Sequence, residues 1–212
     1  MATGIVSIAA APLGLRPVAM ILLAVNLIAF PLLWVLTLAR LSCDPLAFLA
    51  DLGDHERGPG LLTVVAGTGV LGNQISLLMA HQAIAAMLWL GAFALWAIII
   101  YYLFAAATVG ALKPPLDAPL DGHWLLTAVA TEAAAILGTH VASVFSSPEI
   151  IVFASLCLFL LGGVIYVIII THILNRWLFE WMLPEQPTPS YWINMGGGRH
   201  RDTLRCAPHN RS

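Results

Sequence analysis

The chain has 212 residues, of which 60% are hydrophobic and 9% are charged, and its mean hydropathy is +0.90. About a quarter of the residues in a typical soluble domain are charged, so this composition excludes an ordinary soluble protein. The net charge is −2, and the sequence has no nucleic-acid-binding patch, nucleotide-binding loop or hydrolase motif. We therefore interpret the chain as an integral protein of the lipid bilayer that is not an enzyme.

Apolar stretches long enough to cross a membrane follow one another along the chain. A helix needs about 20 mostly apolar residues to span a hydrocarbon core of about 30 Å, because its backbone polar groups must be hydrogen-bonded within the helix. Residues 2–15 are too few, and we expect them to be a first span whose beginning is missing. Five full-length spans are predicted at 18–39, 60–80, 83–107, 124–145 and 150–171. The sequence thus predicts an all-α membrane protein of about six helices in three hairpins.

Basic residues indicate the orientation of these spans. If the N-terminus is cytoplasmic, the outer loops carry Arg16 alone. The cytoplasmic loops then carry Arg40, Arg57, Lys113 and Arg176. Because cytoplasmic loops are enriched in Lys and Arg, we predict a multi-pass protein of the cell (inner) membrane with a cytoplasmic N-terminus.

The odd-numbered spans are smaller and more polar than the even-numbered spans. The third contains LLTVVAGTGVLGNQ at residues 61–74, with three glycines, two threonines, an asparagine and a glutamine. Projected as a helix, this segment places Thr63, Gly67, Val70 and Gln74 on one face. The even-numbered spans are rich in Leu, Ile, Val and aromatic residues, as expected for helices that face lipid.

The fifth span contains LLTAVATEAAAILGTHVA and groups Thr131, Ala135, Gly138 and Thr139 on one face. Stripes of small residues are the usual surfaces for close packing of membrane helices, and threonine can hydrogen-bond its own backbone. Close packing alone gives no reason for every second span to have a small face. We therefore favour an inner ring of odd-numbered helices around a solvated path, enclosed by outer even-numbered helices.

Glu132 is the only acidic residue in the middle of a span. A charged side chain at a helix centre costs about 2.5–3.5 kcal/mol on insertion scales, so it faces a cavity, has a partner or is protonated. We hypothesise that Glu132 borders the path and takes up a proton, because burial favours the neutral form. A structural hydrogen bond to a neighbouring helix is an equal alternative.

Histidines and cysteines do not complete a recognisable cofactor site. His140 and His172 are predicted near opposite membrane surfaces, so they cannot bind the same haem. His81 and His140 are both predicted near the outer surface, but no other residue completes a site with them. The three cysteines have no metal-ligand spacing. We predict neither a cofactor nor a metal.

Four stretches carry a resemblance to a known family: ATGIVSIAA at 2–10, HERGPGLLTVVAGTGVLGNQ at 55–74, DGHWLLTAVATEAAAILG at 121–138 and PSYWINMG at 189–196. In this order they resemble the tellurite-resistance/dicarboxylate transporter family, whose relatives include malate carriers, sulfite pumps and the plant guard-cell slow anion channel. The resemblance implies ten helices in five hairpins about a pseudo-five-fold axis, with the odd-numbered helices lining an anion path. It also implies that homotrimers occur among the relatives.

The sequence departs from this pattern after residue 196. Residues 197–212, GGRHRDTLRCAPHNRS, are polar and basic, and they cannot cross a bilayer. We expect this tail to be a frameshift product or a premature end, so that residues 1–196 form a transporter domain with three of the five hairpins. The resemblance places a path-plugging phenylalanine on the ninth span, which lies outside this sequence, so no gating residue is assigned.

These observations predict a secondary transporter or channel for small anions, either C4-dicarboxylates carried with protons or tellurite and related oxyanions. A non-transporting membrane fragment or assembly partner is the alternative, and an intramembrane redox subunit is a more distant one. The candidate path residues are Thr63, Gly67, Thr68, Gln74, Thr131, Glu132 and Thr139.

Overall fold

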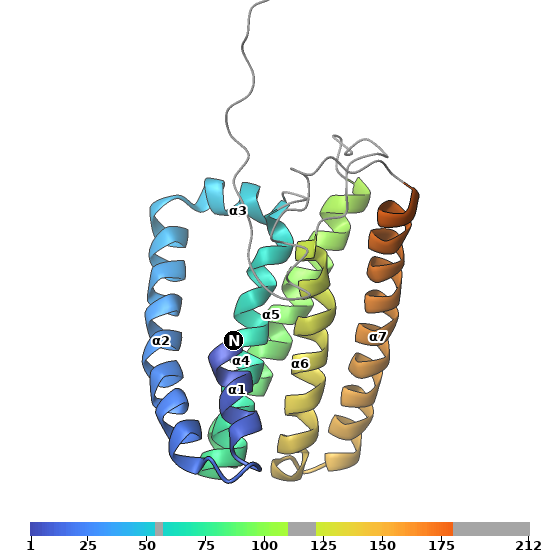
Figure 1. The fold of residues 1–212 in the computed structure, drawn as a ribbon. Helices are drawn as coiled ribbons and strands as arrows, with labels where there is room; N and C mark the ends of the chain where they lie inside the picture. Colours follow the sequence, from blue (N-terminus) through green and yellow to red (C-terminus); the bar gives the residue numbers. More distant parts are fainter. Residues whose placement is uncertain (54–56, 110–121, 180–212) are drawn as a thin grey trace, which may run out of the picture.

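The computed structural model describes residues 1–53, 57–109 and 122–179, which form a bundle of helices (Figure 1). The motif predicted at 189–196 and the tail predicted at 197–212 lie outside the described residues. The described residues contain no strand, in agreement with the predicted all-α class. The helices are α1 (Ala2–Ala10), α2 (Arg16–Cys43), α3 (Pro45–Gly53), α4 (Leu62–Gln74), α5 (Gln82–Val109), α6 (Leu125–Val141) and α7 (Pro148–Phe179).

Among the described residues, five helical segments are long and apolar enough to cross a membrane. In two of them, shorter turns extend the α-helix: α4 lies within the segment Gly58–Met79, which ends in a π-helical turn, and α6 lies within Gly122–Val144. These bounds are close to those predicted for the third and fifth spans. The predicted first span is represented by α1, which has nine residues. At 1.5 Å per residue, α1 is about half as long as the bilayer core is thick.

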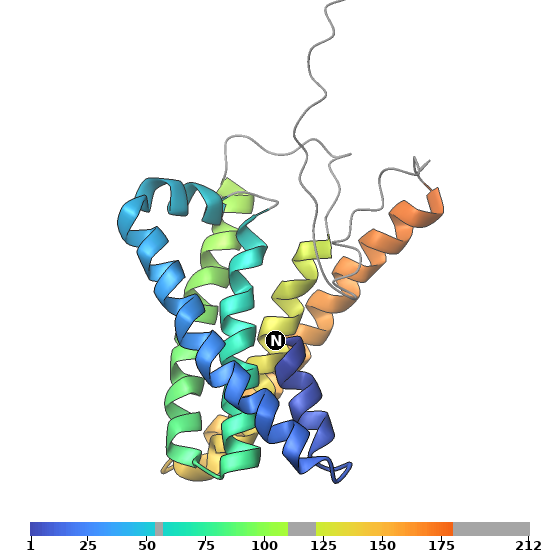
Figure 2. The same ribbon diagram turned by 60° about the vertical axis from the view of Figure 1, so that its left-hand side comes forward.

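The helices form an inner and an outer group (Figures 1 and 2). Within the spanning segments, the buried share of residues is 61% around α4 and 72% around α6. The corresponding share is 11% in α2 and 22% in both α5 and α7. The small-residue third and fifth spans are therefore inner helices, and the bulky even-numbered spans are outer helices, as the sequence predicts.

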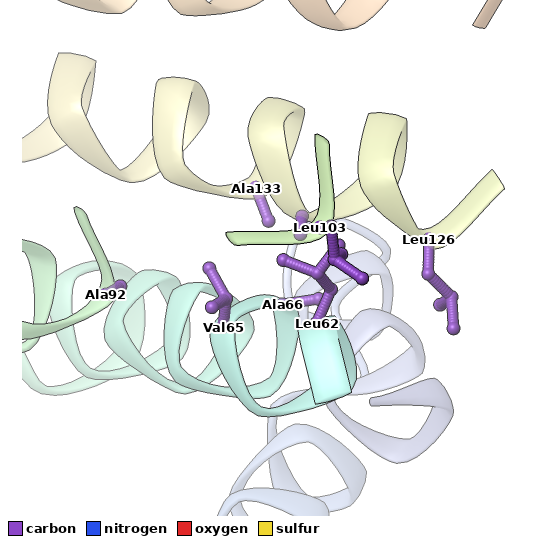
Figure 3. Packing of buried hydrophobic residues seen from close by; sticks show 8 residues of the cluster. Leu62, Val65, Ala66, Ala92, Leu103, Leu126 and Ala133 are labelled. Atoms are coloured by element: carbon purple, nitrogen blue, oxygen red, sulfur yellow. The ribbon is translucent and has the colours of Figure 1, made fainter. Parts of the chain in front are cut away.

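Glycines in α4 allow α6 to approach closely. A Cβ atom built at Gly69 would lie 3.0 Å from Ala133 Cβ and 3.1 Å from the Ala133 carbonyl oxygen. A Cβ atom at Gly72 would overlap the Leu137 side chain. Such close approach favours association in lipid, where dispersion contacts replace the hydrophobic effect as the driving force. Figure 3 shows the apolar cluster beside this contact, formed by Leu62, Val65, Ala66, Ala92, Leu103, Leu126, Ala130 and Ala133.

Two tryptophans of α5 pack against the small-residue face of α6. Trp89 Nε1 donates to the Ala134 carbonyl oxygen at 3.0 Å, and Trp96 Nε1 donates to Thr131 Oγ1 at 2.8 Å. Gly138 leaves room for an indole, because a Cβ atom there would lie 2.8 Å from Trp89 Nε1. Thr131 and Gly138 therefore pack against the outer helix α5, where bulky indoles require small residues opposite them, whereas Thr139 is exposed. A role of this face in a transport path stays a prediction.

The helix α3 crosses one end of the bundle between α2 and α4 (Figure 2). Its Asp51 pairs with Arg40 at the end of α2 and accepts a hydrogen bond from Arg57 at 3.0 Å. Arg16 begins α2 at the opposite end. Exposed ion pairs contribute at most about 1 kcal/mol, so the main importance of these cations is their position at one end of the bundle. The cytoplasmic assignment of that end stays a prediction.

Candidate functional site

The third-span face projected from the sequence lines a groove between α1, α2 and α4, which we call the α2–α4 groove. Its volume is about 470 Å³, and Thr63, Gly67, Val70 and Gln74 are among its lining residues. The helical projection therefore placed these four residues on the same face as the structure does. The role of Thr63, Gly67 and Gln74 in a transport path stays a prediction.

A chain of polar side chains lies beside α1 in this groove. Thr3 Oγ1 donates to Asn26 Oδ1 at 2.6 Å, and Asn26 Nδ2 donates to Gln74 Oε1 at 2.8 Å. Gln74 is fully buried, and its Nε2 has no hydrogen-bond partner among the described residues. A buried donor without a partner costs about 1–3 kcal/mol. Sequence reasoning missed Asn26, although a single asparagine in an apolar span signals an interhelical hydrogen bond.

Thr68 and Thr131 do not lie on an open face. Thr68 is buried, and its Oγ1 donates to the Val64 carbonyl oxygen at 2.7 Å. Thr131 is fully buried; its hydroxyl donates to the Thr127 carbonyl oxygen at 2.6 Å and accepts the bond from Trp96. Both hydroxyl groups therefore serve the packing and hydrogen bonding of the helices that carry them.

A second face, on α6, is not covered by the described helices. It includes Val129 and Ile136, which are 37% and 48% exposed, and the exposed Thr139. Glu132 lies at its edge and is half-buried against α7, where a Cβ atom at Gly162 would lie 2.8 Å from Glu132 Cγ. The lack of a side chain at Gly162 thus makes room for Glu132. Of the predicted path residues, the structure places Glu132 and Thr139 on this helix and Thr63, Gly67 and Gln74 in the α2–α4 groove.

His140 connects this face to α4. The exposed His140 lies in the last turn of α6, and its Nδ1 is 2.7 Å from Oδ1 of the buried Asn73. An N–H group at Nδ1 therefore donates to Asn73, which fixes the orientation of the ring and leaves Nε2 on its other side. Sequence reasoning considered His140 only as a cofactor ligand. The pairing was not predictable, because periodicity within one helix does not give the register between two.

Comparison with known proteins adds a finding that covers most of the chain. The family model described as SLAC1, voltage-dependent anion channel, matches residues 1–197. The chain belongs to this family. No curated protein and no solved structure matches the chain.

Membership in the voltage-dependent anion channel family confirms the resemblance carried by the four motifs. The family consists of multi-pass anion channels and transporters rather than enzymes, and the five apolar helices agree with this class. The lipid bilayer and an anionic substrate therefore follow from the family as partners. Among the described residues, no group of three His, Cys, Asp or Glu side chains could hold a metal ion.

Proposed function

We propose that the chain carries small anions across the cell membrane, either C4-dicarboxylates or oxyanions such as tellurite, along the open face of α6. The family match over residues 1–197 is the observation that carries this proposal. The position of α6 supports it, because this inner helix keeps Thr139 and His140 exposed and Glu132 partly exposed.

Glu132 is the proposed proton carrier. Glu132 lies in the middle of a span, and the residue is partly exposed at the edge of the open face. Charging it there costs about 2.5–3.5 kcal/mol on insertion scales, so protonation lowers this cost. Protonation also removes a negative charge beside a passing anion. The movement of an anion along α6 therefore favours proton uptake by Glu132, which couples the two species.

His140 is the proposed anion-attracting residue at the end of this face. Asn73 holds its Nδ1, so Nε2 is the nitrogen that can reach an anion. When the ring is protonated, both nitrogens carry hydrogen and the ring attracts negative charge. The C-terminal end of a helix favours a cation through the helix dipole, and His140 lies in the last turn of α6. This end lies opposite the cytoplasmic end in the proposed orientation.

Uptake of radiolabelled malate and of tellurite into proteoliposomes tests the proposal. We expect pH-dependent flux above that of empty vesicles, and a flatter pH dependence in Glu132→Gln. Glu149→Gln is the matched control, because Glu149 is an exposed acid in the first turn of α7. Folded protein without flux for either anion would contradict transport. A pH profile that is the same in Glu132→Gln and the parent would contradict the proton role alone.

A second candidate function is that of an assembly partner. The exposed Val129 and Ile136 favour it, because they are apolar residues left uncovered on a spanning segment whose buried share is 72%. Disulfide cross-linking of Val129→Cys in native membranes tests this function, with the native cysteines replaced. Assembly would be supported by covalent dimers together with anion flux that occurs only in vesicles holding several copies of the chain. The homotrimer expected from the resemblance is one such assembly. Flux from vesicles that hold a single uncross-linked copy would favour independent transport.

A further inference from the structure

Glu132 is held in place by packing rather than by a polar partner. Among the described residues, no hydrogen bond or ion pair involves its carboxyl group. Its side chain instead contacts α7, which lies beside α6 in both views of the ribbon (Figures 1 and 2). The contact on α7 is made at the buried Gly162. The position of the carboxyl group therefore depends on the space that α7 leaves for the side chain.

Gly162 leaves space for one atom of Glu132 in particular. A Cβ atom built at Gly162 would lie 2.8 Å from Glu132 Cγ, which is closer than real Cβ contacts. The same atom would lie 3.5 Å from the Ala128 carbonyl oxygen and 3.6 Å from the Glu132 backbone nitrogen, which are ordinary van der Waals distances. A methyl group at this position therefore fits between the two backbones. Only the Glu132 side chain would have to move.

The neighbouring Gly163 shows that this requirement belongs to one position. Both glycines lie inside α7, but nothing lies within 4 Å of a Cβ atom built at Gly163. Alanine is favoured over glycine in a helix, and this gain is the same at both positions. The two glycines thus form a matched pair in which only Gly162 contacts Glu132.

A displaced Glu132 side chain would move onto the open face of α6. Long side chains in helices adopt two common χ1 rotamers, because the third clashes with the preceding turn. A Cγ atom that is excluded from one rotamer therefore takes the other. The residues one turn before and after Glu132 are the exposed Val129 and Ile136. Movement away from α7 brings the carboxyl group toward these two residues.

We propose that Gly162 is a positioning residue for anion transport: it lets Glu132 lie against α7, at the edge of the open face instead of on it. This inference rests on the proposed function, in which anions pass along this face and Glu132 takes up protons. A carboxylate on the face would repel a passing anion more strongly than one at the edge, because the Coulomb energy falls with distance. The protonated group carries no charge, so its position matters much less to the anion.

Other titratable residues on α6 and on the elements packed against it also affect the pH dependence of transport. In the described parts of the chain, α4 has none and those of α5 are tyrosines. The remaining ones are His140 on α6, His123 in the turn before it, and Glu149, Cys157, Tyr166 and His172 on α7. Histidines change charge between about pH 5 and pH 8. The contribution of Glu132 is therefore isolated by measuring each glycine variant with and without its carboxyl group.

Uptake of radiolabelled malate into proteoliposomes at about pH 5 and about pH 8 tests the proposal. In Gly162→Ala, flux at the higher pH should fall several-fold relative to flux at the lower pH, because more of Glu132 is then charged. Gly163→Ala is the matched control and should keep the flux ratio of the parent. In the Glu132→Gln background, Gly162→Ala should leave the ratio unchanged. Equal ratios for the two glycine variants, or an effect that persists with Glu132→Gln, would overturn the positioning role.

Thiol labelling locates the side chain without requiring transport. With the native cysteines replaced, Glu132→Cys places Sγ at the γ position that contacts Gly162. A water-soluble thiol reagent should react with it several-fold faster in the Gly162→Ala background than in the parent or Gly163→Ala background. Equal rates would overturn the proposal, whether or not the chain transports malate. Absence of flux in the parent, or the parent pH profile in Glu132→Gln, would contradict the proposed function instead.

A double substitution separates displacement of Glu132 from damage to the bundle. Any loss of folded protein in Gly162→Ala should be recovered in the Glu132→Ala background, because the Cγ atom that meets the new methyl group is then absent. Recovery would show that the methyl group is incompatible with the Glu132 side chain alone. A loss that persists in this background would show that α7 itself cannot accept the methyl group, and it would overturn the proposal.

Discussion

The contact between α4 and α6 makes a quantitative prediction for two glycines of one helix. Substitution by alanine at either position should gain about 0.8–1.0 kcal/mol of helix propensity. At Gly67 nothing lies within 4 Å of the new Cβ atom, whereas at Gly69 it would lie 3.0 Å from Ala133 Cβ and 3.2 Å from the Ala133 carbonyl carbon. The atoms at Gly69 belong to a backbone and a one-carbon side chain, so they cannot rotate away.

Overpacking of this kind costs about 1–3 kcal/mol. The propensity gain is common to the two variants, so Gly69→Ala should be less stable than Gly67→Ala by about 1–3 kcal/mol. Unfolding in mixed micelles with increasing dodecyl sulfate, followed by far-ultraviolet circular dichroism, measures this difference. Equal stability of the two variants would refute the close approach of α4 and α6 at Gly69.

Three other side chains yield predictions of similar sharpness. Trp96→Phe removes the donor to Thr131 and should cost about 0.5–1.5 kcal/mol in the same unfolding assay, whereas an unchanged midpoint would contradict this bond. Asn26→Leu leaves Gln74 Oε1 without its donor and should lower the free energy of unfolding by about 1–3 kcal/mol. Asn26→Ser leaves room for a water molecule to bond Gln74 and should recover part of this loss. A Leu variant as stable as the parent would contradict the network. His140→Gln keeps a hydrogen-bonding side chain but loses the positive form, so malate KM should rise several-fold with little change in unfolding; an unchanged KM would exclude the anion-attracting role.

The inner and outer groups of helices were predictable because span length and residue size are properties of local sequence. The short α3 was missed, since a nine-residue helix is far below the length of a span. The projection also predicted correctly that Thr63 and Gly67 share one face, because both line the same groove. That this face borders a transport path stays a prediction.

The direction of the α6 face was not predictable. Periodicity shows that Thr131 and Gly138 share a face, but it does not show which neighbour lies opposite. The indoles of Trp89 and Trp96 occupy that position. A small-residue face therefore has two physical explanations, and only the position of the bulky partner decides between them.

The two indole bonds also bear on how the protein enters the bilayer. Of the five spanning segments among the described residues, the α6 segment is the least apolar, and it contains a central carboxyl group, which is costly to insert. The preceding α5 segment is strongly apolar and carries both tryptophans. A nascent α5 that waits in the lipid can offer its indole donors to α6 as the latter leaves the translocon. The fourth and fifth spans would then be integrated together as a hairpin, with the outer helix acting as a membrane anchor for the inner one.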